Sequence, residues 1–168
     1  MPILTDLAEK TGTSAYLIVL DNDEALCLER IDCHHNFQVL FLKIGGRMPL
    51  HIGAGSRVLL AYLPEMEIEK IVKSKGLCPR TKYSIANYQA LEKNLQKIRK
   101  QGYALSWKDV HEGAAALGCP VRNWKNEVVA AISISGMADD FSKQRLPHLV
   151  QMVKDASCEL SHRLSATV

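Results

Sequence analysis

The segment AAISISG, residues 130–136, carries two hydroxyl groups in an otherwise apolar stretch. Ser133 and Ser135 are two positions apart, so on a β-strand their side chains share one face with Val129 and Ala131. Serine hydroxyls donate and accept hydrogen bonds, and this face could therefore bind a small polar ligand. Alternatively, the serines face solvent or satisfy a buried carbonyl. The residues of the opposite, fully apolar face are Ala130, Ile132 and Ile134.

The glycine-rich segment HIGAGS, residues 51–56, is a second candidate site. If a helix begins near Gly53, the backbone amides of Gly53 to Ser56 have no acceptor within the helix and lie at the positive end of its dipole. Glycine and alanine leave room for a ligand to reach the backbone. This pattern predicts a carboxylate or phosphate site, although a helix start capped by water has the same sequence features.

The segment CHH, residues 33–35, places a thiol beside two imidazoles, which are groups used in metal sites and by cysteine nucleophiles. On a strand Cys33 and His34 point to opposite faces, whereas in a turn they could meet. Because no acid or second ligand pair lies at zinc spacing, a surface turn is the favoured interpretation. His51 is likewise expected to fix its loop rather than to act as a base. The sequence therefore predicts no catalytic residue, no metal and no cofactor.

Strands and helices alternate along the chain without internal repeats. The predicted strands are 15–20, 25–31, 38–44, 103–106, 114–121 and the strand that contains residues 130–136, with a hairpin turn at 21–24. The predicted helices are 2–12, 53–62, 64–73, a basic helix around 88–100 and a long last helix. The last helix has an apolar stripe made of Leu146, Leu149, Val150, Val153, Ala156, Leu160 and Leu164. This pattern predicts an α+β fold in which helices pack on an antiparallel sheet.

Length and composition limit the classes of protein that this chain can belong to. With 168 residues, of which 47% are hydrophobic, one domain over residues 1–168 is expected. No apolar run is long enough to span a membrane and the N-terminus lacks the pattern of a signal peptide, so we expect a cytoplasmic protein that does not bind membranes. The five cysteines have no C-x-x-C spacing and are expected to be free thiols; they are Cys27, Cys33, Cys78, Cys119 and Cys158.

Charge gives no sign of a nucleic-acid surface. The net charge is +3, with 21 Lys and Arg against 18 Asp and Glu. The densest basic run, KNLQKIRK at residues 93–100, alternates with apolar residues at helical spacing and is interpreted as the solvated side of a helix. No DNA- or RNA-binding motif is visible, so only weak, salt-sensitive binding to duplex DNA is expected of this chain.

Four blocks of the sequence, in this order, resemble the effector-binding domain of the isocitrate-lyase-regulator (IclR) family of bacterial transcription factors. The blocks cover nearly the whole chain and are GGRMPLHIGAGSRVLLAYLP, LEKNLQKIRKQGYALSWKDVHEGAAALGCPV, NEVVAAISISG and the long last helix. The resemblance implies a GAF-like antiparallel sheet of about six strands flanked by helices, with long N- and C-terminal helices. It also implies a pocket, between the sheet and the loop before the first long helix, for a small organic acid, aromatic or sugar-derived metabolite.

The resemblance assigns ligand-contact roles to four residues of this chain. Gly53 and Ala54 match backbone donors at the helix start, and Ser133 and Ser135 match strand hydroxyls that would form the pocket floor. Pocket size is expected to depend on a loop and a strand whose facing the sequence leaves open; the residues concerned are Met48, Phe37, Leu40 and Phe41.

The chain also departs from the family pattern. Ser56 and Arg57 follow the glycine turn where many members have lysine, so that lysine's role is not expected here. A member that binds small keto acids has an acid and a thiol where this chain has Ser106 and Ala116, which predicts a reshaped pocket. Cys119 lies three residues further on and is a weaker candidate for the pocket, a buried structural thiol being the alternative.

The family's winged helix-turn-helix has no counterpart before Ala15. The chain is therefore interpreted as a regulatory domain that would reach DNA only through a missing N-terminal domain, and as a homodimer or homotetramer. A ligand that prefers one arrangement of the oligomer would then alter operator binding. Two alternatives remain at this point: a GAF-like enzyme with a Cys/His site, and an interaction module whose pocket is filled by side chains.

Overall fold

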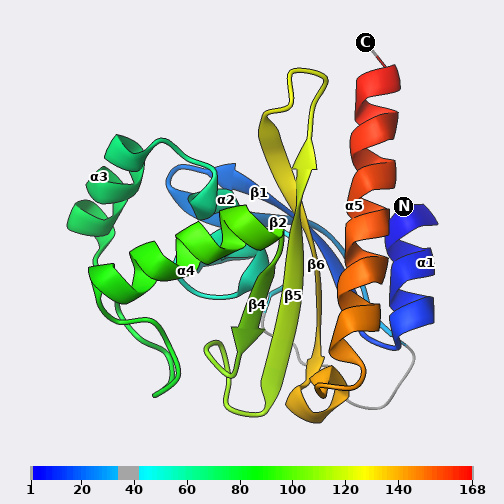
Figure 1. Ribbon diagram of the computed structural model, residues 1–168, viewed down its shortest axis with the longest axis horizontal. Coiled ribbons are helices and arrows are strands. Elements are labelled where there is room, and N and C mark those ends of the chain that lie inside the picture. The colour runs from blue at the N-terminus through cyan, green and yellow to red at the C-terminus, as the bar shows by residue number, and fades with distance from the viewer. Residues whose placement is uncertain (1, 34–41, 168) are drawn as a thin grey trace.

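The computed structural model describes residues 2–33 and 42–167, and its centre is a six-stranded antiparallel sheet (Figure 1). The strand order across the sheet is β3-β2-β1-β6-β5-β4. The strands are β1 (Ser14–Asp21), β2 (Glu24–Ile31), β3 (Arg47–Pro49), β4 (Ala104–Trp107), β5 (Ala114–Arg122) and β6 (Val128–Met137). The predicted α+β fold with about six antiparallel strands is confirmed.

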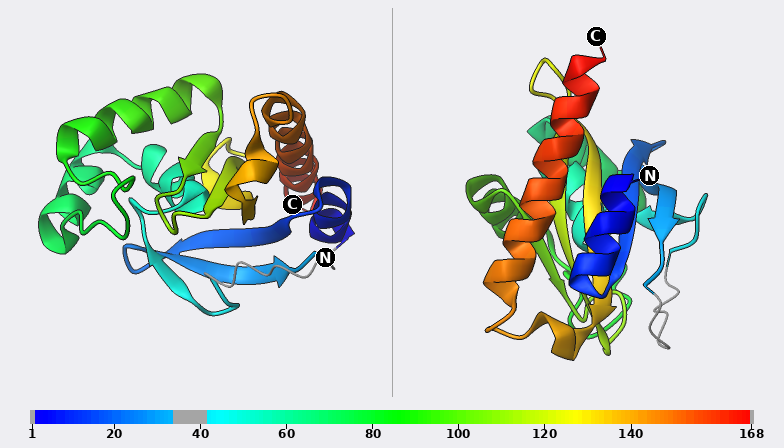
Figure 2. Two further views of the ribbon diagram at one scale, coloured as in Figure 1. Left: turned by 90° about the horizontal axis from the view of Figure 1, so that it is seen from below. Right: turned by 90° about the vertical axis from the view of Figure 1, so that its right-hand side faces the viewer.

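Helices cover both faces of this sheet. One face carries the first and last helices, which lie side by side, and the other carries the three middle helices (Figures 1 and 2). The helices are α1 (Pro2–Thr11), α2 (Ala54–Ala61), α3 (Glu65–Lys75), α4 (Tyr88–Gln101), the short 3-10 helix η1 (Ala138–Phe141) and α5 (Leu146–Ala166). Within the described residues, no helix combines the length and the apolar character needed to cross a membrane.

Two separate hydrophobic cores result from the alternation of side chains along the strands. In β6, Ile132 and Ile134 belong to the core under α1 and α5, whereas Ala131 belongs to the core under α2, α3 and α4. This is the alternation that the sequence predicts for the strand. The two faces of one strand therefore serve different cores.

The turns follow the local sequence closely. In the β1–β2 hairpin, Asn22 and Asp23 have φ of 48° and 63°, which is the left-handed backbone that a two-residue turn of this kind requires. Helix α4 is capped at its start by Asn87, whose side chain accepts a hydrogen bond from the Ala90 amide, and at its end by Gly102 with φ of 80°. Its basic residues lie on the solvated side, as predicted, because its buried positions are Leu91, Leu95 and Ile98.

The third strand lies later in the chain than predicted. Residues 42–44 of the predicted strand 38–44 are not in a strand, residues 38–41 lie outside the described part, and β3 begins at Arg47. Gly45, with φ of 78°, donates from its amide to the Cys27 carbonyl, and the Gly46 carbonyl accepts from the Cys27 amide. The two glycines thus form the bend that brings β3 against β2.

The apolar stripe of α5 is buried only along the sheet. Leu149, Val153 and Leu160 are buried, whereas Leu164, near the C-terminal end of the helix, is 41% exposed. Periodicity identified the face of the helix correctly, but not where its contact with the sheet ends.

Candidate functional site

A pocket lies between the sheet and the beginning of α2. Strand pairing builds its floor, because Ser106 of β4 lies opposite Ala116 of β5, and Ala116 lies opposite Ser135 of β6. In the next row Ser133 lies between Gly118 of β5 and Tyr16 of β1. Small side chains at the centre of this face leave about 480 Å³ of space, counting the open mouth of the pocket.

Glycines on both sides allow α2 to lie directly on the sheet. A Cβ atom on Gly118 would be 2.9 Å from the Gly55 amide nitrogen, and a Cβ on Gly55 would be 2.7 Å from the Ile18 Cδ1 atom and 3.3 Å from the Ser133 Cβ. The backbone contact leaves no room for a side chain at Gly118, whereas a side chain at Gly55 would have to displace the end of the Ile18 side chain and would press on Ser133. The start of α2 and the serine-bearing strand therefore form two close walls of one pocket.

The first amide at the helix start is bound by the protein itself. The Gly53 N–H donates to Oδ2 of Asp109 at 3.2 Å, and Oδ1 of the same carboxylate accepts a hydrogen bond from the Ser106 hydroxyl. Asp109 is buried and comes from the loop between β4 and β5. The sequence predicted four free amides at this helix start; the one at Gly53 is occupied by an internal carboxylate.

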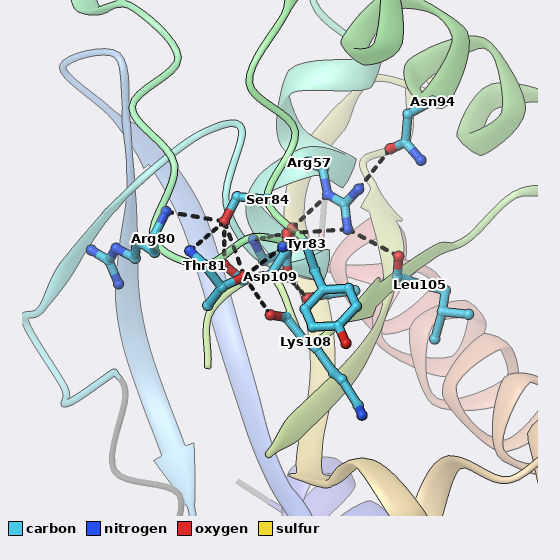
Figure 3. A network of polar contacts seen from close by, with 11 residues as sticks. Arg57, Arg80, Thr81, Tyr83, Ser84, Asn94, Leu105, Lys108 and Asp109 are labelled. Carbon is cyan, nitrogen blue, oxygen red and sulfur yellow. Dashed lines mark hydrogen bonds and ion pairs between the residues drawn. The ribbon is translucent and has the colours of Figure 1, made fainter. Parts of the chain in front are cut away.

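Arg57 balances the charge of this carboxylate (Figure 3). It is 4% exposed, and its Nη2 lies 3.5 Å from Oδ2 of Asp109. Its remaining hydrogen bonds go to the Gly53 carbonyl at 3.1 Å, Oδ1 of Asn94 at 2.9 Å and the Leu105 carbonyl at 2.9 Å. Burial lowers the pKa of Arg57, and the neighbouring Asp109 opposes that shift. Arg57 thus connects α2, α4, β4 and the Asp109 loop.

Two further side chains hold the Asp109 loop from outside the pocket (Figure 3). The Thr81 hydroxyl donates to the Lys108 carbonyl at 2.7 Å, and the Ser84 hydroxyl donates to the Asp109 carbonyl at 2.7 Å. Both belong to the segment between α3 and α4. The pocket wall at Asp109 is therefore tied to that surface segment.

The strand serines also have partners within the protein. Ser133 Oγ donates to the Leu117 carbonyl at 2.8 Å, and Ser135 Oγ donates to the Tyr16 hydroxyl at 3.1 Å. Burial raises the pKa of Tyr16, while hydrogen bonds with Ser135 and Ser14 oppose the rise. Both serines still line the pocket and retain oxygen lone pairs. Ser133 therefore satisfies a buried carbonyl, which was one of the alternatives for these serines, and also lines the pocket.

The structure brings most of the predicted site residues together. Those that line the pocket are Met48, Gly53, Ala54, Ser106, Ala116, Ser133 and Ser135. Cys119 does not line it, because its side chain lies in the core under α1 and α5, on the opposite face of the sheet. The predicted contributions of Phe37, Leu40 and Phe41 fall outside the described residues.

Sequence reasoning missed several residues of this region, among them Tyr16, Leu42 and Asp109. Tyr16 and Leu42 line the pocket, and Asp109 supports it from behind. The signal for Tyr16 was its alternation with Ile18 on β1, since both face the pocket. No local pattern identifies Asp109, which meets Gly53 across 56 positions of sequence.

The other chemically interesting residues are apart from the pocket. His51 is buried and its Nε2 donates to the Cys78 carbonyl at 2.8 Å, which matches its expected role of fixing a loop. Cys33 is partly buried, while His34 and His35 of the CHH segment are outside the described residues. In the described part of the chain, no group of three or more His, Cys, Asp and Glu side chains is arranged to hold a metal ion.

Known proteins match this chain in sequence and in fold. Residues 1–162 match the family described as "Bacterial transcriptional regulator IclR C-terminal". The HTH-type transcriptional regulator KipR of Bacillus subtilis (strain 168) is 32% identical over 166 residues, which are 99% of this chain and 66% of KipR. The chain spans about two thirds or less of the length of the curated relatives that it matches.

Solved structures show the same fold. The crystal structure of the Thermotoga maritima IclR has a TM-score of 0.91 and 28% identity, covering 97% of this chain and 66% of that one. A double mutant of the PobR inducer-binding domain from Acinetobacter, crystallised with 3-hydroxybenzoic acid, has a TM-score of 0.87 and 22% identity over 95% of this chain and 94% of that domain. The second likeness concerns the fold alone.

The family match over nearly the whole chain and the shared six-stranded fold agree with each other, and the matched relatives are transcriptional regulators rather than enzymes. The chain belongs to the IclR family of bacterial transcriptional regulators, as a C-terminal effector-binding domain.

Proposed function

We propose that the pocket between α2 and the sheet binds a small organic metabolite that carries a carboxylate. The observation that supports this proposal is the pocket itself, whose one wall is the start of α2 and whose other wall carries Ser106, Ser133 and Ser135. Amides in the first turn of a helix have no acceptor within the helix and lie at the positive end of its dipole, which favours an anion. The binding of 3-hydroxybenzoic acid by the PobR domain is in keeping with such a ligand.

Mass spectrometry of the small molecules released from the purified, denatured domain tests this proposal directly. Calorimetry with the compound that it identifies then compares two variants with the unchanged domain. Ser133→Ala should weaken binding roughly five- to a hundredfold, since it removes an oxygen from the floor. Ala54→Pro should weaken it as well, because proline is tolerated in the first helical turn but has no N–H. Unchanged affinity in both variants would place the ligand elsewhere, and release of no carboxylate would contradict the proposed ligand class.

In the intact regulator, we propose, this ligand controls DNA binding by favouring one arrangement of a homodimer or homotetramer. The partner DNA is contacted through an N-terminal domain of the family type, and a regulator that binds operator DNA works in the cytoplasm. Light scattering of the domain at micromolar concentration should detect a dimer or tetramer. A monomer throughout that range, or a sequence-specific shift of duplex DNA by this domain at physiological salt, would contradict the proposal.

A further inference from the structure

A cluster of basic and aromatic side chains lies on the surface where the segment between α3 and α4 meets the end of β4. The Lys108 Nζ is 5.7 Å from the centre of the Tyr83 ring and 5.5 Å from the centre of the Trp107 ring. Tyr83 is 44% exposed and Trp107 is 41% exposed. The cluster is called the basic patch below, and its residues are Arg80, Lys82, Tyr83, Trp107 and Lys108.

The basic patch is held in a fixed arrangement but its charges are not balanced. The Thr81 and Ser84 hydroxyls, which donate to carbonyls of the β4–β5 loop, fix one part of the patch to the other (Figure 3). A surface that is already ordered loses less conformational entropy when a partner docks on it. In the part of the chain that the structure describes, none of the three cations of the patch forms an ion pair with a carboxylate.

A groove of about 830 Å³, counting its open mouth, lies between α3 and α4. The groove is called the acidic groove below, because Glu65 and Glu92 line it beside apolar and aromatic side chains. The apolar and aromatic lining residues are Tyr62, Leu63, Ile68, Tyr88 and Leu95.

Three carboxylates gather at the Tyr88 end of the acidic groove. The pKa of Tyr88 is raised by partial burial and by the negative charges of Glu69, Glu92 and Glu65, which lie near its hydroxyl. Within residues 2–33 and 42–167, none of these three carboxylates forms an ion pair. This end of the groove therefore favours a cationic partner.

The cations near the acidic groove belong to its other end. Arg99 lies two helical turns beyond Glu92 on α4, and its Nη1 donates to the Ala61 carbonyl at 2.8 Å. The Arg122 guanidinium is stacked on Tyr62, with its Cζ 4.7 Å from the centre of the ring. The carboxylates at the Tyr88 end are therefore left for a partner.

The basic patch and the acidic groove are neighbours, because the segment that carries Tyr83 leads directly into Tyr88 at the start of α4 (Figure 1). In a dimer with two-fold symmetry each copy contributes the same surface, so complementary features must lie on both sides of the axis. Three unpaired cations beside three unpaired carboxylates satisfy that condition. A second copy of this chain therefore covers both surfaces at once, whereas an acidic or a basic partner of another kind would cover only one.

We propose that two copies of this domain dock so that the basic patch of each lies on the acidic groove of the other; this inference names the contact of the homo-oligomer proposed above and rests on that proposal. The cations of one copy face the carboxylates of its partner. The exposed aromatic rings of the patch supply the apolar contact, as aromatic residues commonly do at the centre of protein interfaces.

Charge reversal on each surface tests the contact. One variant carries Lys82→Glu and Lys108→Glu, and the other carries Glu65→Lys and Glu92→Lys. Each variant alone brings like charges together at both symmetric contacts, so we expect association to weaken at least about tenfold. Light scattering at micromolar concentration should show that the mass of each variant falls to half that of the unchanged domain.

Mixing the two variants gives the sharpest measurement. In the mixed pair, the reversed patch of one copy meets the unchanged negative charge nowhere, because it faces the reversed groove of the other copy, and the two unchanged surfaces face each other as well. An equimolar mixture should therefore recover the mass of the unchanged domain. Recovery also shows that both variants are folded, since misfolded chains would not assemble on mixing.

The turn between β5 and β6 provides matched controls. Lys125 Nζ lies 5.0 Å from the centre of the Trp124 ring, which is 60% exposed, so the same chemistry occurs there outside both surfaces. Lys125→Glu and Trp124→Ala should leave the mass unchanged, whereas Tyr83→Ala should weaken association roughly tenfold.

The possible failures are distinguishable. A monomeric unchanged domain would contradict both the proposed oligomer and this inference. An oligomer whose mass is unaffected by both charge reversals would overturn the inference alone, and would leave the two surfaces for partners other than a second copy. Reversal variants that dissociate but do not assemble with each other would also overturn it, because the two surfaces would then not meet.

Discussion

The two faces of β5 and β6 are built from alternate residues of the same two strands, yet one face is tightly packed and the other leaves a pocket. Toward α1 and α5 the strands present Leu117, Ile132 and Ile134, which are fully buried and fill the core between the sheet and these helices. This is called the filled face below. Toward α2 they present Ala116, Gly118 and Ser133, which leave a pocket. Close packing stabilises the first face, whereas the second has small side chains and polar contacts. Adjacent residues of the same strand therefore contribute either to a packed core or to the wall of the pocket.

The face that carries Ala116, Gly118 and Ser133, called the hollow face below, is held in place mainly by polar contacts. Around the pocket, Asp109 and Arg57 form a buried polar network that joins α2, α4, β4 and the β4–β5 loop. A wall made of small residues offers little apolar contact area, so polar bonds fix its position.

The largest expected effect is therefore on the hollow face. Asp109→Ala should lower the free energy of unfolding by about 3–5 kcal/mol, because it leaves the Arg57 charge buried without its ion pair. Urea denaturation measures this change. The control is Asp140→Ala, whose ion pair with Arg145 is about half exposed and should be worth less than about 1 kcal/mol. Similar losses in the two variants would mean that the network does not fix the pocket wall.

The filled face should show the next largest loss. Ile132→Ala removes a side chain that is 0% exposed and should lower the free energy of unfolding by about 2–4 kcal/mol, through lost burial and a new cavity. Ser133→Ala, one position along the strand, should cost about 1 kcal/mol, since only its bond to the Leu117 carbonyl is lost. The same denaturation experiment compares them, and equal losses would remove the distinction between the faces.

Gly118→Ala sharpens the comparison by filling the hollow face. The new Cβ would meet the Gly55 amide nitrogen at 2.9 Å, and backbone cannot move aside as a side chain can. We expect a loss of about 1–3 kcal/mol and at least a tenfold weakening of acid binding, as α2 is pushed from the sheet. Gly136→Ala on β6 is the control, because its nearest contact is the Thr13 methyl at 3.3 Å. Thermal melts and calorimetry measure both quantities, and unchanged binding by Gly118→Ala would show that the helix start is not a wall of the site.

The same alternation decided how much the sequence could predict. Period-two patterning placed Ser133 and Ser135 on the small face of their strand and Ile132 and Ile134 on the other, as the structure has them. It could also have separated Ala116 from Cys119, since residues three apart on a strand point to opposite faces.

Contacts between distant segments could not be predicted in this way. Asp109 reaches Gly53 from a loop, and nothing in its neighbours marks it as the partner of a helix start. The third strand was placed too early because an apolar run suggests a strand, whereas its position depends on the bend at Gly45 and Gly46 against β2. The family resemblance predicted where the pocket lies, but it did not predict the polar contacts between distant segments, such as that of Asp109 with Gly53, that form its wall.

The filled face also responds to alkaline pH. Burial raises the pKa of Cys119 from 9.0 to about 12, because a thiolate is poorly solvated in the core under α1 and α5. The folded state keeps the proton at pH values where the unfolded chain releases it. This contribution to stability is complete below pH 9 and is lost, by about 1.4 kcal/mol per pH unit, as the pH rises toward 12.

Urea denaturation between pH 8 and pH 11 should therefore show a shallower alkaline loss of stability in Cys119→Ala than in the unchanged domain. Cys158→Ala, in which the removed thiol is exposed, should follow the unchanged domain. Cys27 is buried under the other helices and has a raised pKa as well, so part of the alkaline loss should remain in Cys119→Ala. Identical slopes in all three proteins would mean that Cys119 is reached by water before the domain unfolds, and that the face under α1 and α5 is less tightly closed than its packing indicates.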